Sequence, residues 1–126
     1  MKRILLLVFM FISAKSFSQD FYLGRTFDEI GISLTSAQVG IFSGKKCLNQ
    51  TVDSNTREIY IFDINNTCVE YIRIVKNTSI NNIEEFYLRS YIKGSDNIYI
   101  DYSGGLVAMV NPSENIFEIR FRKNKF

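Results

Sequence analysis

The stretch from Thr56 to Lys76, TREIYIFDINNTCVEYIRIVK, decides the fold that we predict. Two runs rich in β-branched and aromatic residues flank Asn65 and Asn66, and asparagine accepts the positive φ angles that a two-residue hairpin turn requires. A hairpin that turns there pairs acid with base and aromatic with aromatic. The predicted pairs are Glu58 with Arg73, Tyr60 with Tyr71 and Phe62 with Val69 on one face, and Arg57 with Ile74, Ile59 with Ile72 and Ile61 with Glu70 on the other. Both faces carry large apolar side chains, which favours the middle of a sheet.

The start of the chain has the pattern of a secretory signal peptide. Lys2 and Arg3 precede an apolar run from Ile4 to Ile12, and small residues follow at Ser16 and Ser18. The run is shorter than the roughly 20 residues that a membrane-spanning helix needs. We therefore predict a signal peptide over residues 1–18, a single domain over residues 19–126, and export to the periplasm or the medium without a retained membrane anchor.

Charge gives no indication of a polyanionic partner. The whole chain carries 15 basic and 13 acidic groups, and removal of the leader with Lys2, Arg3 and Lys15 leaves 12 basic groups against 13 acidic ones. Nucleic acid is therefore not an expected partner. The tail from Arg120 to Phe126 is locally basic, and its alternation of apolar with basic residues predicts a last strand with one solvated face.

Two cysteines remain in the predicted domain, Cys47 and Cys68. In an exported chain an even count favours a disulfide, which would stabilise a small domain by roughly 3 kcal/mol through the loop that it closes. The alternative is a pair of buried thiols. A zinc site is disfavoured because the chain has no histidine to complete the ligand shell.

Two helices are predicted beside the strands. Thr26 and Glu29 form a capping-box pattern before an apolar stripe that runs to Ala37, and a second stripe begins after Ser79 and continues through Tyr91 to a stop at Gly94. Alternating residues predict further strands over 97–103 and 117–122, and a continuous apolar run predicts one over 106–110. The expected fold is therefore α+β, with a single antiparallel sheet of five to six strands and two helices packed on one face, in the order helix, strands, helix, strands.

Residues that carry catalysis are hard to find. Without histidine the chain lacks the usual general base near neutral pH, so catalysis would depend on carboxylates, lysine, tyrosine or cysteine. The run from Asp63 to Thr67 resembles the opening of a calcium loop, but it lacks the glycine and the closing acid of such a loop, and we interpret it as a turn stabilised by its own Asp and Asn side chains. We predict no catalytic residue, metal or cofactor.

Tyrosines are the candidate binding surface. Tyr60, Tyr71, Tyr99 and Tyr102 would present aromatic rings to a peptide or a sugar if they were exposed. The alternative is that they line the border of the core with the hydroxyl groups in water.

Two short motifs carry a resemblance to known proteins: Gly24-Arg-Thr-Phe-Asp-Glu-Ile30 and Phe62-Asp-Ile-Asn-Asn-Thr-Cys68. They resemble uncharacterised small exported proteins of Gram-negative bacteria. The Gly-x-Thr-x-x-x-Ile helix start is also similar to outer-membrane assembly lipoproteins of the SmpA/OmlA type, and the plan of elements is similar to β-lactamase-inhibitor-like domains. The chain lacks the anchoring cysteine of the lipoproteins, and neither group implies catalytic residues here.

The leading hypothesis for function is an exported, non-enzymatic binding module for an unknown protein or envelope component. A small carboxylate-dependent hydrolase is the alternative from another class, and an inhibitor or immunity-like protein is a third. Two carboxylates that converge in a polar cleft would favour the hydrolase, and scattered carboxylates would favour the module.

Overall fold

The computed structural model describes residues 22–34, 36–103 and 105–124. The predicted signal peptide and its cleavage site after Ser18 lie outside the described residues. Within the described ranges, no helix combines the length and the apolar character that crossing a bilayer requires.

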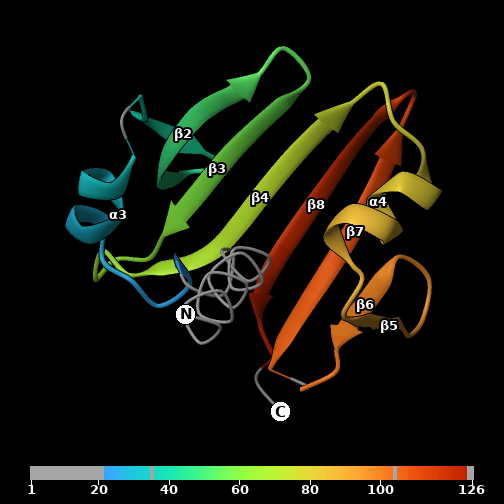
Figure 1. Ribbon diagram of the computed structural model, residues 1–126. Coiled ribbons are helices and arrows are strands. Elements are labelled where there is room, and N and C mark those ends of the chain that lie inside the picture. The colour runs from blue at the N-terminus through green and yellow to red at the C-terminus, as the bar shows by residue number, and fades with distance from the viewer. Residues whose placement is uncertain (1–21, 35, 104, 125–126) are drawn as a thin grey trace, which may run out of the picture.

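Two short helices and eight strands make up the described chain (Figure 1). In chain order they are α3 (Phe27–Ser33), β1 (Gln38–Phe42), β2 (Lys45–Asp53), β3 (Thr56–Phe62), β4 (Cys68–Lys76), α4 (Ile80–Tyr87), β5 (Tyr91–Lys93), β6 (Ile98–Asp101), β7 (Leu106–Ser113) and β8 (Ile116–Lys123). The strands form one antiparallel sheet in the order β1-β2-β3-β4-β8-β7-β6-β5.

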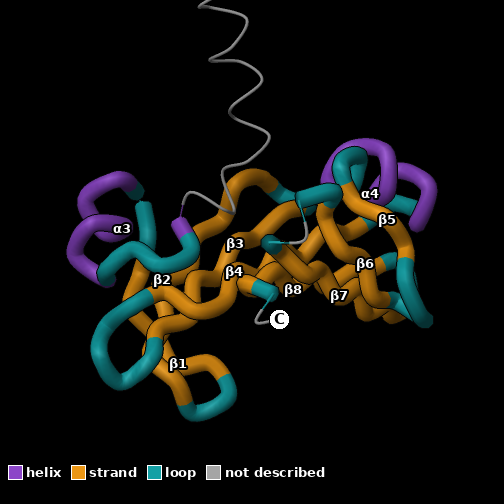
Figure 2. The backbone as a smooth tube through the Cα atoms, turned by 90° about the horizontal axis from the view of Figure 1, so that it is seen from below, coloured by secondary structure: helices purple, strands orange, loops and turns teal. Residues whose placement is uncertain are grey.

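The predicted fold class is wrong in its proportions. The sheet has eight strands rather than five or six, and the helices have only seven and eight residues, too few to cover a sheet of this width. Figure 2 shows them on the same side of the sheet but at its two ends, with the middle strands between them. The molecule is therefore a large twisted sheet with two small helical caps, not an α+β layer structure.

The central hairpin has the predicted register over most of its length. Arg57 to Ile61 pair with Ile74 to Glu70 as expected, which confirms the contacts of Tyr60 with Tyr71 and of Glu58 with Arg73. The turn differs, because a bulge pairs Phe62 with Cys68 instead of Val69. The loop is stabilised by the Asp63 carboxylate, which accepts hydrogen bonds from the backbone N–H groups of Asn65 and Thr67 at 2.9 and 3.0 Å. The predicted Asx-stabilised turn is thus confirmed, with five residues in place of two.

The second helix ends earlier than predicted. Ser79 caps it as expected, but α4 stops at Tyr87, and Tyr91–Lys93 form the edge strand β5. Tyr91 fits the apolar stripe at helical spacing, so periodicity alone does not separate the two assignments. Pairing with β6 decides the outcome, because it gives the backbone of residues 91–93 its hydrogen-bond partners. This strand, which was predicted as part of the second helix, accounts for part of the low predicted strand count.

The two halves of the chain repeat one plan. Each is a short helix followed by four strands in a meander, and β4 pairs with β8 at the centre of the sheet. Because these two strands are antiparallel and the strand order is mirrored about them, an approximate twofold axis passes between them, perpendicular to the sheet. This arrangement brings the last strand of each half side by side although they lie about 45 residues apart in the chain.

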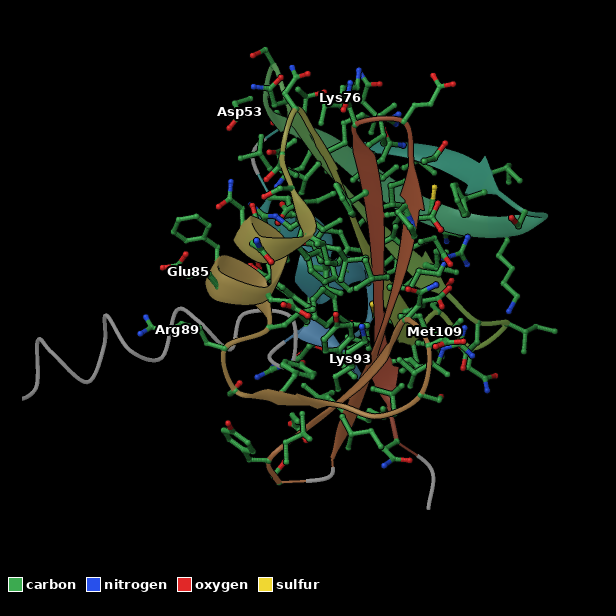
Figure 3. All side chains as sticks on the ribbon, turned by 90° about the vertical axis from the view of Figure 1, so that its right-hand side faces the viewer. Asp53, Lys76, Glu85, Arg89, Lys93 and Met109 are labelled. Atoms are coloured by element: carbon green, nitrogen blue, oxygen red, sulfur yellow. The ribbon has the colours of Figure 1, made fainter. Side chains whose placement is uncertain are left out.

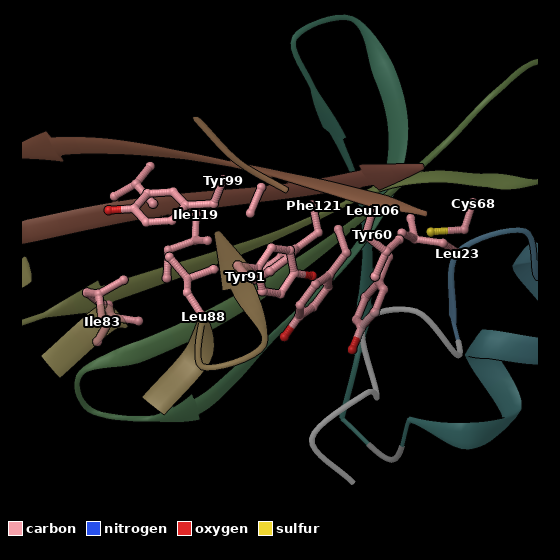
Figure 4. Close-up of a cluster of buried hydrophobic side chains, with 14 of the residues drawn as sticks. Leu23, Tyr60, Cys68, Ile83, Leu88, Tyr91, Tyr99, Leu106, Ile119 and Phe121 are labelled. Carbon is pink, nitrogen blue, oxygen red and sulfur yellow. The ribbon is translucent and has the colours of Figure 1, made fainter. Parts of the chain in front are cut away.

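The larger core lies on the side of the sheet that carries the helices. Ile30 of α3 and Ile83 of α4 are fully buried against it, and a row of rings crosses the sheet between them. The ring centroids of Tyr60 and Tyr71 lie 5.0 Å apart, and those of Tyr71 and Phe121 5.6 Å apart. Figure 4 shows Tyr60 and Phe121 in one cluster with Ile83 and Leu88.

A second, smaller cluster lies on the opposite side, which we call the far face. It consists of Cys47, Ile59, Ile61 and Ile72, with Phe42 of β1 packed against it. Figure 2 shows β1 on the side of the sheet away from the helices. The hairpin of β1 and β2 therefore curls over the far face and covers β3 and β4 there.

Candidate functional site

The candidate site lies where the two central strands separate. β4 and β8 are paired from Lys76 and Ile116 to Tyr71 and Phe121, and no pairing continues beyond Tyr71. β8 nevertheless stays paired with β7 as far as Lys123. Residues 68–70 of β4 and residues 122–123 of β8 consequently face each other across a gap in the sheet, which is visible in Figure 1 where the two strands spread apart.

The segment before α3 fills part of this gap. The Gly24 N–H donates to the Cys68 carbonyl at 2.8 Å, and the Cys68 N–H donates to the Arg25 carbonyl at 2.7 Å. Gly24 has a φ of +87°, and a Cβ atom there would lie 3.0 Å from Nζ of Lys123. Glycine is thus favoured by the backbone, because other residues rarely adopt this positive φ.

What remains of the gap is a cavity of about 400 Å³, here called the β4–β8 cavity. Its walls come from four separate segments of the chain. The residues that line it are Leu23, Gly24, Lys45, Thr67, Cys68, Val69, Glu70, Arg122 and Lys123. A volume of this size lies in the range of about 300–1,000 Å³ that is typical of small-molecule sites.

Glu70 is the acidic residue of the cavity, and ion pairs with two arginines balance its negative charge. Its side chain is 12% exposed, and its two oxygens accept hydrogen bonds from Arg122 at 2.7 Å and from Arg120 at 3.4 Å. Arg120 also donates to Glu118 at 2.7 Å, so two arginines and two glutamates form one network on the far face. The basic residues of β8 that were predicted to lie on a solvated face therefore hold the glutamate of the neighbouring strand.

The two lysines of the cavity differ from Glu70 and Arg122 in their interactions. Among the described residues, the ammonium groups of Lys45 and Lys123 have no ion pair or hydrogen bond. The adjacent Lys46 is engaged, because it donates to Oδ1 of Asn66 at 3.1 Å and lies 3.8 Å from the centre of the Phe27 ring. The cavity thus contains three cationic groups against one carboxylate, and two of the cations have no counter-charge.

The cysteines are free thiols, and the predicted disulfide is not formed in the structure. Cys47 belongs to the far-face cluster and Cys68 to the larger core, so the two side chains point to opposite sides of the sheet. β3 lies between their strands, and a separation of two strand spacings, about 9–10 Å, exceeds the Cα distance of a disulfide. Burial raises the pKa of the Cys68 thiol to about 12, so the thiol stays protonated and is a poor nucleophile at neutral pH.

The four tyrosines of the predicted binding surface do not form one. Tyr60, Tyr71 and Tyr99 are each at most 3% exposed and belong to the larger core, whereas Tyr102 is 69% exposed in a turn. The Tyr99 hydroxyl donates to Glu84 of α4 at 2.6 Å, and burial together with this hydrogen bond raises the pKa of Tyr99 to about 12. The predicted alternative, in which tyrosines line the core, describes three of the four.

Glu58 is the centre of a second polar cluster, on the helix side of the sheet. It accepts hydrogen bonds from Gln50 at 2.8 Å, from the Tyr71 hydroxyl at 2.5 Å and from Arg73 at 2.8 Å. Burial raises the pKa of both Tyr71 and Tyr60, so neither hydroxyl acts as a base near neutral pH. Since each group of the cluster is used by another, it fastens β2, β3 and β4 together rather than offering a reactive group.

Among the described residues, the carboxylates of the two polar clusters do not converge in one cleft as those of a glycosidase-type hydrolase do. Glu58 and Glu70 lie on opposite faces of the sheet, because Glu58 shares a face with Tyr60 while Glu70 pairs with Ile61 of the far-face cluster. Glu70 and Glu118 share a face, but the Arg120 guanidinium binds both. In the part of the chain that the structure describes, no group of three or more acidic or cysteine side chains is arranged to hold a metal ion.

Sequence reasoning missed Lys45, Arg122 and Lys123 as members of one site. Lys45 opens β2, and the basic tail was expected to present one face to solvent. Leu23 packs against the core with 4% exposure. The basic tail was the sequence signal that could have indicated the site. The gap beside residues 68–70 forms only in the folded sheet, so the sequence does not show what the tail contacts. Comparison with known proteins adds no assignment: no family model, no curated protein and no solved structure matches this chain.

Proposed function

We propose that this protein is an exported binding module without catalytic chemistry, and that the β4–β8 cavity is its binding site. The observation that carries the proposal is the gap between two strands that are paired over the rest of their length. A sheet that gives up backbone pairing loses hydrogen bonds that the lead-in segment only partly replaces. A binding site between the two strands would explain why these backbone hydrogen bonds are missing.

The chemistry of the cavity walls supports binding over turnover. The carboxylate is held by arginines, the thiol is protonated, and the lysines lie in an open, solvent-accessible part of the molecule. Such groups attract and orient a ligand, but they do not include an acid and a base placed to transfer a proton. The leader pattern of residues 1–18 supports export, and an envelope component is therefore the proposed kind of partner.

The test is recovery of a bound molecule from the protein purified out of the envelope fraction of the cells that produce it. Organic extraction and mass spectrometry of the extract would identify what the protein carries. We expect wild-type protein to release a defined compound and the variant V69W, in which a bulky ring fills the cavity, to release little of it.

The matched control is I92W, which adds the same ring on β5 at the far end of the sheet. This variant should release as much compound as wild type. Because the chain has no tryptophan of its own, each introduced ring also reports on folding by fluorescence. Equal release from V69W and I92W, or conversion of the compound by the wild-type protein, would contradict the proposal.

A further inference from the structure

We infer that the ligand of the β4–β8 cavity is an organic anion with a short apolar body, an inference that rests on the proposed function. The first argument is charge. Of the three cations at the cavity, Arg122 is used by Glu70, while the ammonium groups of Lys45 and Lys123 have no partner among the described residues. An anionic group bound at either ammonium would gain a charge-assisted hydrogen bond.

The approach of Lys123 to the backbone gives the second argument. Its ammonium group lies over Gly24, 3.0 Å from where a Cβ atom would stand. Lys123 lies opposite Leu106 on the helix side of the sheet, and Lys45 lies opposite Phe42 on the far face. The two cations therefore reach the cavity from the two faces of the sheet, so an anion can be attracted from either entrance.

The apolar walls exclude a purely inorganic ligand as the best fit. Leu23 and Cys68 are 4% and 2% exposed and form the inner wall, and Val69 lies beside them. A phosphate or sulfate ion would leave this wall unused and most of the 400 Å³ filled with water. A carboxylate, phosphate or sulfonate on a body of a few carbon atoms would use both parts of the cavity.

The ¹H–¹⁵N spectrum of the labelled protein, titrated with four probes, tests this inference. The probes are hexanoate, its neutral analogue hexan-1-ol, its cationic analogue hexylammonium, and inorganic phosphate. We expect hexanoate to shift the amide signals of Gly24, Val69 and Lys123 with the lowest Kd, and hexylammonium to leave them in place. Hexan-1-ol should bind at least about tenfold more weakly, as one lost charged hydrogen bond implies.

Variants identify the groups that hold the anion. K45M and K123M keep the length of the side chain and remove its charge, and each should weaken hexanoate binding about tenfold. K76M removes a charge at the other end of β4 and should leave the Kd unchanged. The dispersion of each spectrum shows whether the variant is folded.

The possible failures are separable from failure of the proposed function. Hexan-1-ol binding as tightly as hexanoate would leave a binding cavity but overturn its preference for an anion. Phosphate binding as tightly as hexanoate would overturn the inference that the ligand has an apolar body. Equal weakening by K76M and K45M would show attraction to general surface charge and overturn the site. The compound released from wild-type protein tests the proposed function independently. A neutral compound would support the binding function but contradict the inference that the ligand is an anion.

Discussion

The two halves of the sheet have the same topology but are buried differently. Strands β3 and β4 of the first half are covered on both faces, because the helix-side core lies on one and the far-face cluster on the other. In the second half the far face is partly open: Ile92 and Ile100 are 57% and 37% exposed. Figure 3 shows Met109 of β7 on the side of the sheet away from α4, while Glu85 extends from α4 into solvent.

The difference comes from the length of the outer hairpins. β1 and β2 have five and nine residues, and their hairpin curls far enough to bring Phe42 onto the far-face cluster. β5 and β6 have only three and four residues and do not reach around the sheet. The same topology thus gives one half that is stabilised from both faces of the sheet and one half that is stabilised from a single face. This comparison of the two halves leads to four predictions.

The largest effect should come from the far face. Ile72→Ala, at a fully buried position in β4, should lower the free energy of unfolding by about 3–5 kcal/mol, because it removes transfer energy and leaves a cavity. The matched change Ile100→Ala in the second half should cost less than about 1 kcal/mol, since that side chain is partly solvated. Urea unfolding measures both, and equal losses would refute the difference between the halves.

The helices test the similarity of the halves rather than their difference. Ile30 and Ile83 are each fully buried and connect α3 and α4 to the same core. Ile30→Ala and Ile83→Ala should therefore destabilise the protein by comparable amounts, about 2–4 kcal/mol each. A helix whose isoleucine could be truncated without loss in a thermal melt would not be anchored to the sheet.

Alkaline pH should weaken the protein mainly through the first half. Burial raises the pKa of Tyr60 and Tyr71 above the ordinary value of 10.0, so the folded protein holds these protons when the unfolded chain loses them. The stabilisation is complete below pH 10 and falls above it, by about 1.4 kcal/mol per pH unit for each buried tyrosine.

Urea midpoints at pH 8, 10 and 11 would show this loss. Tyr71→Phe removes one of the groups with a raised pKa, which also include Tyr60, Tyr99 and Cys68. It should make the decline between pH 10 and 11 shallower, although it also costs stability at pH 8 through the hydrogen bond to Glu58. Tyr102→Phe is the control, because Tyr102 is mostly exposed. A decline of the same steepness in Tyr71→Phe and in wild type would rule out this cause.

The smallest effects should come from the helix caps, and they should differ. In α3 the Thr26 side chain accepts from the Glu29 N–H at 3.2 Å, and the Glu29 carboxylate accepts from the Thr26 N–H at 2.9 Å. The hydrogen bonds that the Thr26 N–H and the Thr26 hydroxyl donate to this carboxylate lower the pKa of Glu29. In α4 only one such bond exists, from the Asn82 N–H to Ser79 at 3.3 Å.

Thr26→Ala should accordingly cost about 1–2 kcal/mol and Ser79→Ala about 0.5–1 kcal/mol, measured by thermal unfolding. Glu29→Gln is a useful companion, since it keeps an acceptor at the cap while it removes the charge. Equal costs at the two caps would indicate that the reciprocal bond contributes nothing measurable.

Local features of the chain were predictable because their partners are close in sequence. The register of β3 against β4 follows from the alternation of side chains, since a slip by one residue would exchange the two faces. The capping box of α3 depends on two residues three positions apart. Hydrophobic periodicity failed at Tyr91, where a short strand and a helical stripe look alike, and it missed the bulge at Phe62.

The amino-acid sequence by itself therefore determined the central hairpin, the helix starts and the last strand. Only the tertiary structure decided the pairing of β4 with β8, the curl of β1 over the far face, the free thiols and the β4–β8 cavity. The physical reason is distance along the chain. Arg122 meets Glu70 across 52 residues, and Lys45 and Lys123 line one cavity although they lie far apart in the chain. Such contacts depend on how the whole sheet twists and where its strands part.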